Sequence, residues 1–583
     1  MTTSDEVYAP PLTDWDDPPN PTYEMWTTVN AAEVVPGVWH PLLSGWFQEQ
    51  QRICFGEMFE RLGITDDITI HPDPIPNFIG TWAGRLALNV GFTTAIVTSY
   101  QTGEGSSAVE QLFTADEEGG HAAEASSNVD QARAVHAKMF RILGQAPRTV
   151  PSDRRRAQAI ADEVASTDLT SISDAALRRL QRRVDTTMHR TFQNHILISV
   201  LGTGEYISLL EQQMAKSGAE IEADATVMLT SALGGVESAQ PMEALWRLSR
   251  WMREQPGFAA ELGPLSWQEI QTQMGSASDG NWRGLSERFE EFLKDYGFRS
   301  QSEWDLGVPR WREDPAMPLN ALRNMASASD ESGPLAPAQR AAAARVAAEQ
   351  RYRDLMPSRQ KTGYDSALAK AQDFVRVRET TKATCIIGNG AGRLTMLEQG
   401  RRWAAKSWLE TADDVFFLLY PEFKEAAESG KLDGPTAKES VRRRRRQWAD
   451  VQDYLLPDNF TGLPEIRRVG EAPAPSSTLT GLGVSPGVVT GPARVIASFS
   501  DGTAADFRPG EILVAPYTDA PWTPLFATAA GVVVETGGVL SHAATVAREY
   551  GIPAVAMIKD ATRMIETGQQ ITVNGGAGQV LLG

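Results

Sequence analysis

Two patterns of apolar and polar residues divide the chain into a long helical region and a shorter mixed region. In the first, apolar residues recur at the three- and four-residue spacing of one helix face. The clearest such segments are 46–62, 174–201, 243–252, 337–356 and 363–382, with Asp174 as the expected cap of the second. In the second region, Gly531–Val534 is rich in β-branched residues and is typical of a buried strand. We therefore expect a mainly α-helical domain followed by a C-terminal α/β domain.

The residues after this strand predict a turn and then a short helix. Gly537 and Gly538 permit a tight turn, or a close approach of the backbone to a ligand. Ser541 is a suitable N-cap for a helix over 542–550. This arrangement places His542 in the first turn, where free N–H groups and the helix dipole favour an anion.

The position of His542 fits two roles. A neutral imidazole nitrogen can attack a phosphoryl group there, and the charged product is stabilised where it forms. A histidine that only caps a helix after a structural glycine turn fits the same residues. Strand, turn and helix alone leave both open, because motif context is what confirms such a site.

The wider stretch resembles the phosphohistidine motif of phosphoenolpyruvate synthase and pyruvate phosphate dikinase. The resemblance rests on Thr536-Gly-Gly-Val-Leu-Ser-His-Ala-Ala544 and Ala547-Arg-Glu-Tyr-Gly-Ile-Pro-Ala-Val555, and it continues upstream into 483–494 and 510–515. It implies a swivelling phosphohistidine domain of α/β fold over 481–583, in which His542 carries the phosphoryl group. The phosphate-binding residues it implies are Thr536, Gly537, Gly538 and Ser541.

The helical region resembles the substrate-binding region of rifamycin phosphotransferase-like proteins. The segments that carry this resemblance are Tyr296-Gly-Phe-Arg299, 308–315, Arg378-Glu-Thr-Thr-Lys382 and 413–418. The resemblance implies a mainly helical acceptor-binding domain over 23–469. That family often has a histidine where this chain has Phe298, so one polar contact is lost, which favours a different acceptor.

Arg378 and Lys382 are four residues apart and therefore share one face of the predicted helix. A guanidinium fork beside a point charge suits a transferring phosphoryl group. Two solvated cations on a helix surface are the alternative on the residues alone. With the resemblance, we expect both to hold the phosphoryl group as it leaves His542, and Arg299 to be a weaker phosphate-binding candidate.

Aromatic residues near the N-terminus could line an apolar pocket with a few polar anchors, or could cover a core. On the first interpretation, Trp26 and Trp39 line the acceptor site together with Phe298 and Trp304. His40 lies in the same segment and could take the acceptor's proton as a general base.

Composition bounds the remaining possibilities. The 583 residues allow three or four domains. The formal net charge of −19 argues against general nucleic-acid binding. Two cysteines, no signal peptide and no long apolar run favour the reduced cytoplasm and no membrane association. His189 and His195 lack the i, i+4 spacing of a helical metal pair, so no metal site is expected.

Two segments are predicted to lie outside compact domains. Residues 1–22 are rich in proline, aspartate and threonine and form an N-terminal extension. Residues 470–480 contain proline, alanine and serine and are typical of a linker. An extended proline-containing linker rises about 3.1 Å per residue, which would let a small domain swing between two sites.

The sequence contains no recognisable phosphate loop of a nucleotide-binding site. Gly388-Asn-Gly-Ala-Gly392 lacks the strand–loop–helix context of a phosphate loop, and we expect neither an ATP-grasp domain nor a TIM barrel. The resemblance then implies a split dikinase-type phosphotransferase of the kind seen in phenylphosphate synthase. A separate ATP-grasp subunit would bind ATP and Mg²⁺ and phosphorylate His542, forming AMP and phosphate.

The expected acceptor is a small aromatic or apolar hydroxyl compound, such as a phenol or alkylphenol, which becomes a phosphate ester. Three alternatives stay open: a rifamycin-type antibiotic phosphotransferase, a phosphoenolpyruvate-dependent system, and a non-enzymatic phosphocarrier or regulatory protein. The run Arg442–Arg446 is expected to be a solvated helix face, or else a docking surface for an acidic partner.

Overall fold

The computed structural model divides into two compact units, each built from three stretches of chain. The first unit contains 1–205, 303–307 and 381–471, and the second contains 206–302, 308–380 and 472–583. The helix α16 (Lys361–Ala405) contributes its first half to the second unit and its second half to the first. The described residues are 7–8, 10–18, 23–29, 37–64, 78–98, 129–218, 220–222, 225–330, 333–468, 477–497, 507–538 and 541–583.

The first unit combines helices with two small antiparallel sheets. Its sheets have the orders β3-β4-β2-β6 and β1-β7-β5. Their strands are β1 (Val7–Tyr8), β2 (Met25–Thr27), β3 (Ile79–Trp82), β4 (Arg85–Asn89), β5 (Tyr454–Leu455), β6 (Asn459–Thr461) and β7 (Ile466–Arg468). Its helices include α2 (Pro41–Leu62), α3 (Val90–Thr98), α5 (Val129–Leu143), α6 (Ala146–Ser166), α7 (Asp174–His195), the π-helix η1 (Ile196–Leu201), η3 (Ala412–Phe417), α17 (Tyr420–Ser429), α18 (Gly434–Asp450) and η4 (Val451–Asp453).

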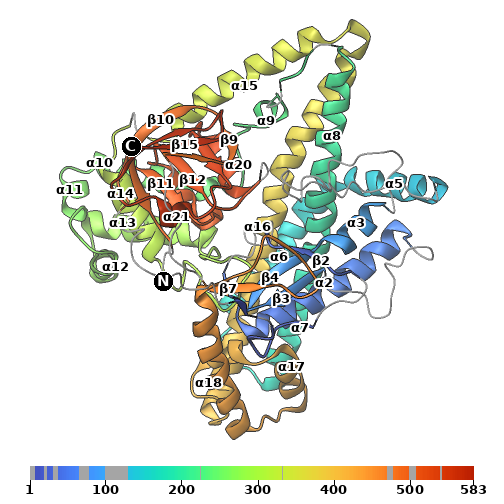
Figure 1. Ribbon diagram of the computed structural model, residues 1–583. Helices are drawn as coiled ribbons and strands as arrows, with labels where there is room; N and C mark the ends of the chain where they lie inside the picture. The colour runs from blue at the N-terminus through green and yellow to red at the C-terminus, as the bar shows by residue number, and fades with distance from the viewer. Residues whose placement is uncertain are drawn as a thin grey trace, which may run out of the picture. The chain divides into compact units, whose positions relative to one another are not determined.

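The second unit begins as a set of helices (Figure 1). They are α8 (Gly202–Ala215), which begins in the first unit, α9 (Ala225–Leu229), α10 (Gln240–Glu254), α11 (Phe258–Leu262), α12 (Trp267–Ser276), α13 (Gly280–Tyr296), α14 (Ala316–Ser327), α15 (Leu335–Leu355) and η2 (Ser358–Gln360). Glycine and proline break the segment between α13 and α14, as the pattern predicts.

The C-terminal part of this unit is an eight-stranded mixed sheet of order β8-β15-β14-β10-β11-β12-β13-β9. The neighbours from β10 to β13 are parallel and the other pairs are antiparallel. The strands are β8 (Thr478–Thr480), β9 (Leu482–Ser485), β10 (Val488–Val495), β11 (Ile512–Ala515), β12 (Gly531–Val534), β13 (Ala554–Ala556), β14 (Gln570–Asn574) and β15 (Gln579–Leu582), with the short helices η7 (Ala520–Trp522), α19 (Thr523–Phe526), α20 (His542–Glu549) and α21 (Ala561–Met564). The expected helical region and C-terminal α/β region are therefore confirmed.

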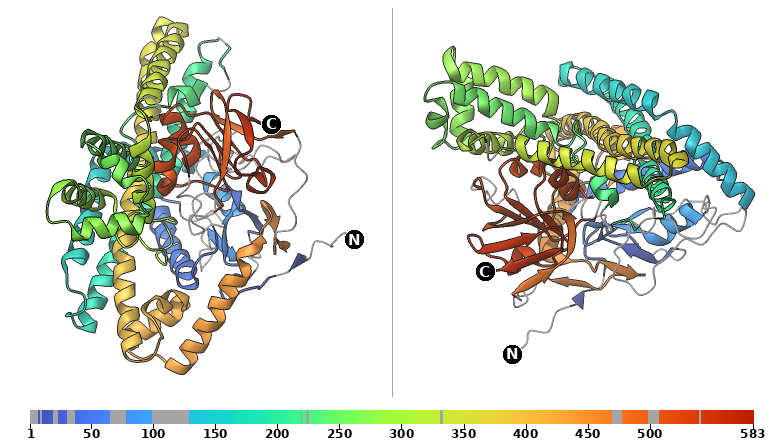
Figure 2. Two further views of the ribbon diagram at one scale, coloured as in Figure 1. Left: turned by 90° about the vertical axis from the view of Figure 1, so that its left-hand side faces the viewer. Right: turned by 90° about the horizontal axis from the view of Figure 1, so that it is seen from above.

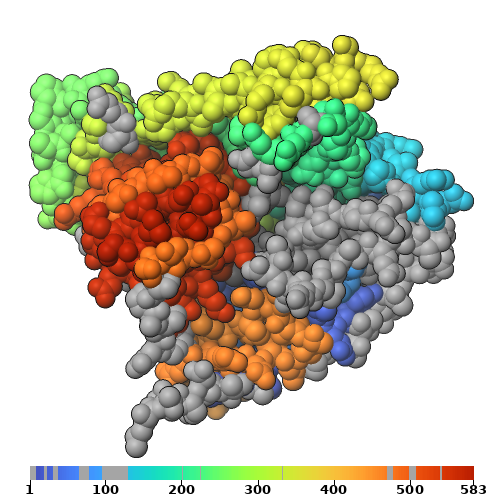
Figure 3. Space-filling view, turned by 45° about the horizontal axis from the view of Figure 1, so that its top comes forward, coloured from blue at the N-terminus to red at the C-terminus, as the bar shows by residue number. Residues whose placement is uncertain are grey.

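One apolar cluster joins this sheet to the helices of the same unit. It contains Trp246 of α10, Met325 of α14, Phe526 of α19 and Val546 of α20, all buried. Figure 2 shows α10 to α14 in green beside the orange and red sheet. Helix α15 runs along the same C-terminal part (Figure 3), where a side chain on Gly551 would meet the carbonyl oxygen of Pro337 at 3.3 Å.

Several local predictions are refined by the structure. The cap of α7 is Ser173, whose hydroxyl accepts a hydrogen bond from the Ala176 N–H, and not Asp174, which is the first helical residue. Of the predicted linker, 470–476 lies outside the described residues, and Thr478–Thr480 form β8. The Arg442–Arg446 run is largely occupied by ion pairs: Arg443 binds Asp14 and Arg444 binds Glu422.

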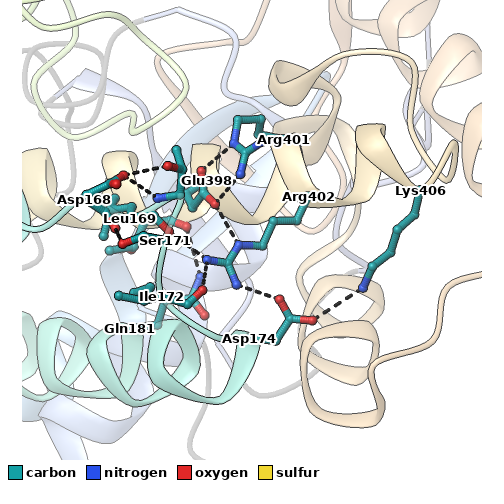
Figure 4. A network of polar contacts seen from close by, with 12 residues as sticks. Asp168, Leu169, Ser171, Ile172, Asp174, Gln181, Glu398, Arg401, Arg402 and Lys406 are labelled. Atoms are coloured by element: carbon teal, nitrogen blue, oxygen red, sulfur yellow. Dashed lines mark hydrogen bonds and ion pairs between the residues drawn. The ribbon is translucent and has the colours of Figure 1, made fainter.

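A buried polar network ties α16 to the start of α7 (Figure 4). Arg402 donates to Glu398 at 2.7 Å and to Asp174 at 2.6 Å. The Nη2 of the same guanidinium group donates to the carbonyl oxygens of Leu169 and Ile172, each at 2.7 Å. Arg402 is buried, and removal of its guanidinium group takes one donor from each of these four acceptors.

Substitution of Arg402 by methionine is expected to lower the free energy of unfolding by about 3 kcal/mol, because it removes one of the two arginines that bind buried Glu398 and takes a donor from the carbonyl oxygens of Leu169 and Ile172. Urea denaturation followed by circular dichroism measures this loss. Lys406→Met is the matched control, since Lys406 is exposed and lies 3.4 Å from Asp174. A loss below about 1 kcal/mol for Arg402→Met would show that the network contributes little.

Candidate functional site

His542 is the first residue of α20, directly after the turn that follows β12. The Ser541 hydroxyl caps the helix by accepting a hydrogen bond from the Ala544 N–H at 3.1 Å, as expected. Gly537 has a φ of +130°, a conformation that favours glycine. The imidazole is 6% exposed, and its Nε2 lies 3.1 Å from the Thr523 hydroxyl.

The neighbouring turn residues differ in what they present. Thr536 donates its hydroxyl to the Pro516 carbonyl oxygen at 3.1 Å, so this group is engaged with the backbone. Among the described residues, no atom other than those of its chain neighbours lies within 4 Å of the position that a Cβ on Gly538 would take. Gly538 thus leaves room for a ligand, and a phosphate-binding role for both residues stays a prediction.

The other end of α20 lies beside Arg378. Arg548 is buried and donates its Nε to the Val484 carbonyl oxygen at 2.6 Å. Burial, followed by the charge of Arg378, lowers the pKa of Arg548 to about 9. Both arginines line one small cavity together with Thr230 and Thr545. At about 1.5 Å per residue, Arg548 is on the order of 9 Å along the helix from His542.

Glu549 holds α20 against the helical part of the same unit. Its carboxylate accepts hydrogen bonds from the Leu233 N–H at 2.9 Å and the Gly234 N–H at 3.0 Å. Burial raises the pKa of this carboxyl group, and the two backbone donors oppose the shift. Tyr550 adds a hydrogen bond to Glu243 at 3.2 Å. The structure thus shows one docked position of the helix that bears His542.

Arg378 and Lys382 lie one turn apart on α16, as the sequence predicts. Arg378 is half-buried. The Lys382 ammonium group lies 3.7 Å from the carboxylate of Glu303, whose side chain is 1% exposed. Lys382 is therefore held in a fixed place by a buried charge, as a residue that positions an anion would need to be.

A small aromatic pocket lies within the first unit. It is lined by Trp304 and by residues of α2, α7 and α16, namely Trp46, Phe47, Gln50, Met188, Thr191, Phe192, Cys385 and Asn389. The ring of Trp304 lies 5.8 Å from that of Phe47 and 5.7 Å from that of Phe192. Burial raises the pKa of the Cys385 thiol, so this cysteine stays protonated and serves as a lining residue.

Of the four aromatic residues expected at the acceptor site, only Trp304 lines this pocket. Trp26 lies in a separate core, edge-on to Trp82 at 4.6 Å. Trp39 is fully buried behind the pocket, 5.3 Å from Phe47. Phe298 is half-buried in the second unit.

Arg299 is buried and donates to the Glu237 carbonyl oxygen at 3.3 Å. Its own carbonyl oxygen accepts the Trp311 N–H at 2.8 Å. These contacts fit a structural role in the turn after α13, and phosphate binding by Arg299 stays a prediction.

His40 forms a pair with a buried carboxylate. Its Nδ1 lies 2.9 Å from Asp305, and this pairing helps to hold the pKa of Asp305 below its ordinary value, against the effect of burial. The ring stacks on Trp448 at 5.6 Å. A carboxylate that orients a histidine is a feature of general bases. However, His40 does not line the aromatic pocket, so its role as base stays a prediction.

The pocket residues that the sequence left unassigned come from stripes at helical spacing. Phe47 and Gln50 are three apart on α2, and Met188 and Phe192 are four apart on α7. Such stripes are typical of a core, and only the crossing of three helices turns them into a pocket lining. The π-helix η1, which follows α7, marks this region as a candidate functional site, because π-bulges are frequent at functional sites.

No helix in the described part of the chain is long and apolar enough to cross a membrane. Within the same residues, no group of three or more His, Cys, Asp or Glu side chains is arranged to hold a metal ion.

Known protein families match one stretch of the helical region and one stretch of the C-terminal region. Residues 195–379 match the rifampicin phosphotransferase fourth domain, and residues 507–578 match the mobile domain of PEP-utilising enzymes. The second match contains His542, and the first contains Arg378.

Similar curated proteins include rifampicin phosphotransferases and one biosynthetic transferase. That of Bacillus cereus is 30% identical over 303 residues, which cover 51% of this chain and 34% of the relative. That of Streptomyces sviceus is 29% identical over 361 residues, 61% of this chain and 41% of the relative. The prodigiosin synthesizing transferase PigC of Serratia marcescens is 31% identical over 345 residues, 57% of this chain and 37% of the relative.

The chain spans 34 to 41% of the length of these three relatives. The rifampicin phosphotransferases among them favour the rifamycin-type alternative over a phenol acceptor. The chain therefore joins a region similar to the fourth domain of rifampicin phosphotransferases to a mobile domain of the PEP-utilising enzymes.

Proposed function

We propose that this chain is a phosphotransferase component that carries a phosphoryl group on His542 and delivers it to a hydroxyl group of an apolar acceptor. The observation that carries the proposal is the position of His542 at the capped N-terminus of α20, within the matched mobile domain. The helix N-terminus favours the charge that the phosphorylated ring carries.

The acceptor is proposed to bind at the aromatic pocket of the first unit, whose volume of about 10 Å³ is room for one water molecule, so that the pocket has to widen to admit the acceptor. Besides its aromatic walls, this pocket has buried polar atoms that could meet a ligand's hydroxyl or carbonyl groups. Among the described residues, the Oε1 of Gln50 and the Nε1 of Trp304 have no hydrogen-bond partner. A buried donor or acceptor without a partner is costly, and an amphiphilic ligand would satisfy it.

A rifamycin-type compound is the first candidate acceptor, because the matched fourth domain and the named relatives point to it. A phenol or alkylphenol is the second candidate. It is favoured by the small size and aromatic lining of the pocket, and by Phe298, which stands where rifamycin phosphotransferases often have a histidine. PigC indicates that relatives of this kind act in other transfer reactions as well.

The phosphoryl donor in this proposal is ATP with Mg²⁺, bound by an ATP-grasp partner that phosphorylates His542 and releases AMP and phosphate. Transfer to the acceptor then breaks the N–P bond and forms an ester bond, while the acceptor's hydroxyl proton passes to a base. Arg378 and Lys382 are proposed to balance the charge of the moving phosphoryl group.

The test combines the chain with a candidate ATP-grasp partner, β-labelled ATP, and a panel of rifamycins and phenols. We expect label on His542 and then on one acceptor class as an acid-stable ester. Label that stays on His542 with every acceptor would contradict an acceptor phosphotransferase and favour a phosphocarrier.

The pocket is tested with Trp304→Ala, which removes one aromatic wall. We expect KM for the acceptor to rise about tenfold, because an aromatic contact of this kind contributes on the order of 1 kcal/mol or more. Labelling of His542 should be unchanged. Trp408→Ala is the matched control, since Trp408 belongs to the same unit and does not line the pocket. An unchanged KM in Trp304→Ala would place the acceptor elsewhere.

A further inference from the structure

The imidazole of His542 has two ring nitrogens with different surroundings. Its Nδ1 is fully buried. Its Nε2 faces the hydroxyl of Thr523 at 3.1 Å. Since this contact is short, a phosphoryl group attached to Nε2 would lie directly beside the Thr523 hydroxyl.

Thr523 is held firmly in this position. It is the first residue of α19, between Trp522 and Pro524, and its side chain is fully buried. Phe526 of the same helix meets the His542 ring edge-on at a centroid distance of 6.4 Å. Hydrogen bonds in such apolar surroundings are stronger than in water, and a buried hydroxyl must find a partner.

We propose that Thr523 is a positioning residue that keeps Nε2 of His542 unprotonated and then binds the phosphoryl group attached there. The inference rests on the proposed phosphoryl transfer and names a further residue for it. A hydroxyl that donates to Nε2 selects the tautomer in which the proton sits on Nδ1. That tautomer leaves the lone pair on Nε2, the nitrogen beside Thr523.

The same hydroxyl has a second role as the bond forms. The Nε2 lone pair forms the N–P bond, the P–O bond of the donor breaks, and its electron pair stays with the leaving oxygen. The proton on Nδ1 stays in place, so the ring becomes cationic without any proton transfer. Rotation about the Cβ–Oγ1 bond of Thr523 lets its O–H turn from Nε2 to a phosphoryl oxygen, which accepts a stronger, charge-assisted hydrogen bond.

The test compares Thr523→Val with Thr523→Ser. Valine keeps the shape of threonine and removes the hydroxyl, whereas serine keeps the hydroxyl. Nitrogen-15 spectra of the histidine rings, recorded without any phosphoryl donor, report which ring nitrogen of His542 carries the proton. The His542 signals among the seven histidines are assigned by their loss in His542→Gln.

We expect wild type and Thr523→Ser to show an unprotonated Nε2, and Thr523→Val to show mixed tautomers. We also expect about fivefold slower labelling of His542 in Thr523→Val and near-normal labelling in Thr523→Ser. Thr528→Val, at a buried threonine of the same domain, should behave as wild type in both measurements.

Identical ring spectra in wild type and Thr523→Val would overturn the inference, as would equal labelling rates in correctly folded protein. If no phosphate reaches His542 in wild type, the proposed function fails, and the ring spectra still decide the role of Thr523 on their own. Unchanged thermal melting of Thr523→Val separates this positioning role from a merely structural one.

Discussion

Substitution of His542 by glutamine is expected to abolish both labelling of the chain and formation of the phosphate ester, a loss of at least about a thousandfold. Glutamine has a similar length and can still pair with the Thr523 hydroxyl at the start of α20, but it has no nucleophilic nitrogen. Gels quenched with detergent at alkaline pH, which preserves the N–P bond, measure the first step with β-labelled ATP, and chromatography of the product measures the second.

The control for this substitution is His136→Gln. The His136 side chain is 38% exposed, lies 3.6 Å from Glu205 and does not line the aromatic pocket. It should leave both steps unchanged. Label that persists on the chain in His542→Gln would place the phosphorylated residue elsewhere and remove the basis of the proposed relay.

The sequence predicts the surroundings of His542 well because local rules determine them. Gly531–Val534 forms β12, Ser541 caps α20, and Gly551 has a φ of +59° just after the helix. Each of these features depends on residues within one turn or strand, and each has a strong residue preference. Local signals therefore place the candidate nucleophile without knowledge of the rest of the fold.

The first unit was much less predictable. The strands β2 and β6 have three residues each and pair with each other although they lie far apart in the sequence, as Trp26 and Phe460 do. Such short strands carry almost no periodic signal. The same non-local contacts explain why Trp26 belongs to a core and not to the pocket.

The aromatic pocket was also hidden by non-local packing. Trp304 comes from a short stretch, 303–307, that joins the first unit although its neighbours in sequence belong to the second. The spacing of residues along α2, α7 and α16 predicts only which face of each helix is apolar. It does not predict that the three faces leave room between them.

Replacement of Arg378 by alanine is expected to slow transfer from phosphorylated His542 to the acceptor about a hundredfold and to leave labelling of His542 nearly unchanged. A fixed cation that balances charge in the transition state contributes roughly two to three orders of magnitude in comparable sites. Chase of the labelled chain with excess acceptor isolates this second step in a single turnover. Arg378→Lys should recover only part of the rate, because lysine lacks the planar fork.

Lys382→Ala should have a smaller effect of the same kind, about tenfold, because a single ammonium group acts as a point charge. Lys382 also forms an ion pair with buried Glu303, so thermal melting must accompany the rate measurement. Lys370→Ala provides the matched control, since Lys370 is exposed on the same helix. Equal transfer rates in wild type and Arg378→Ala would show that α16 does not hold the phosphoryl group. Arg548, which lines the same small cavity as Arg378, would then be the cation expected to balance the charge of the phosphoryl group.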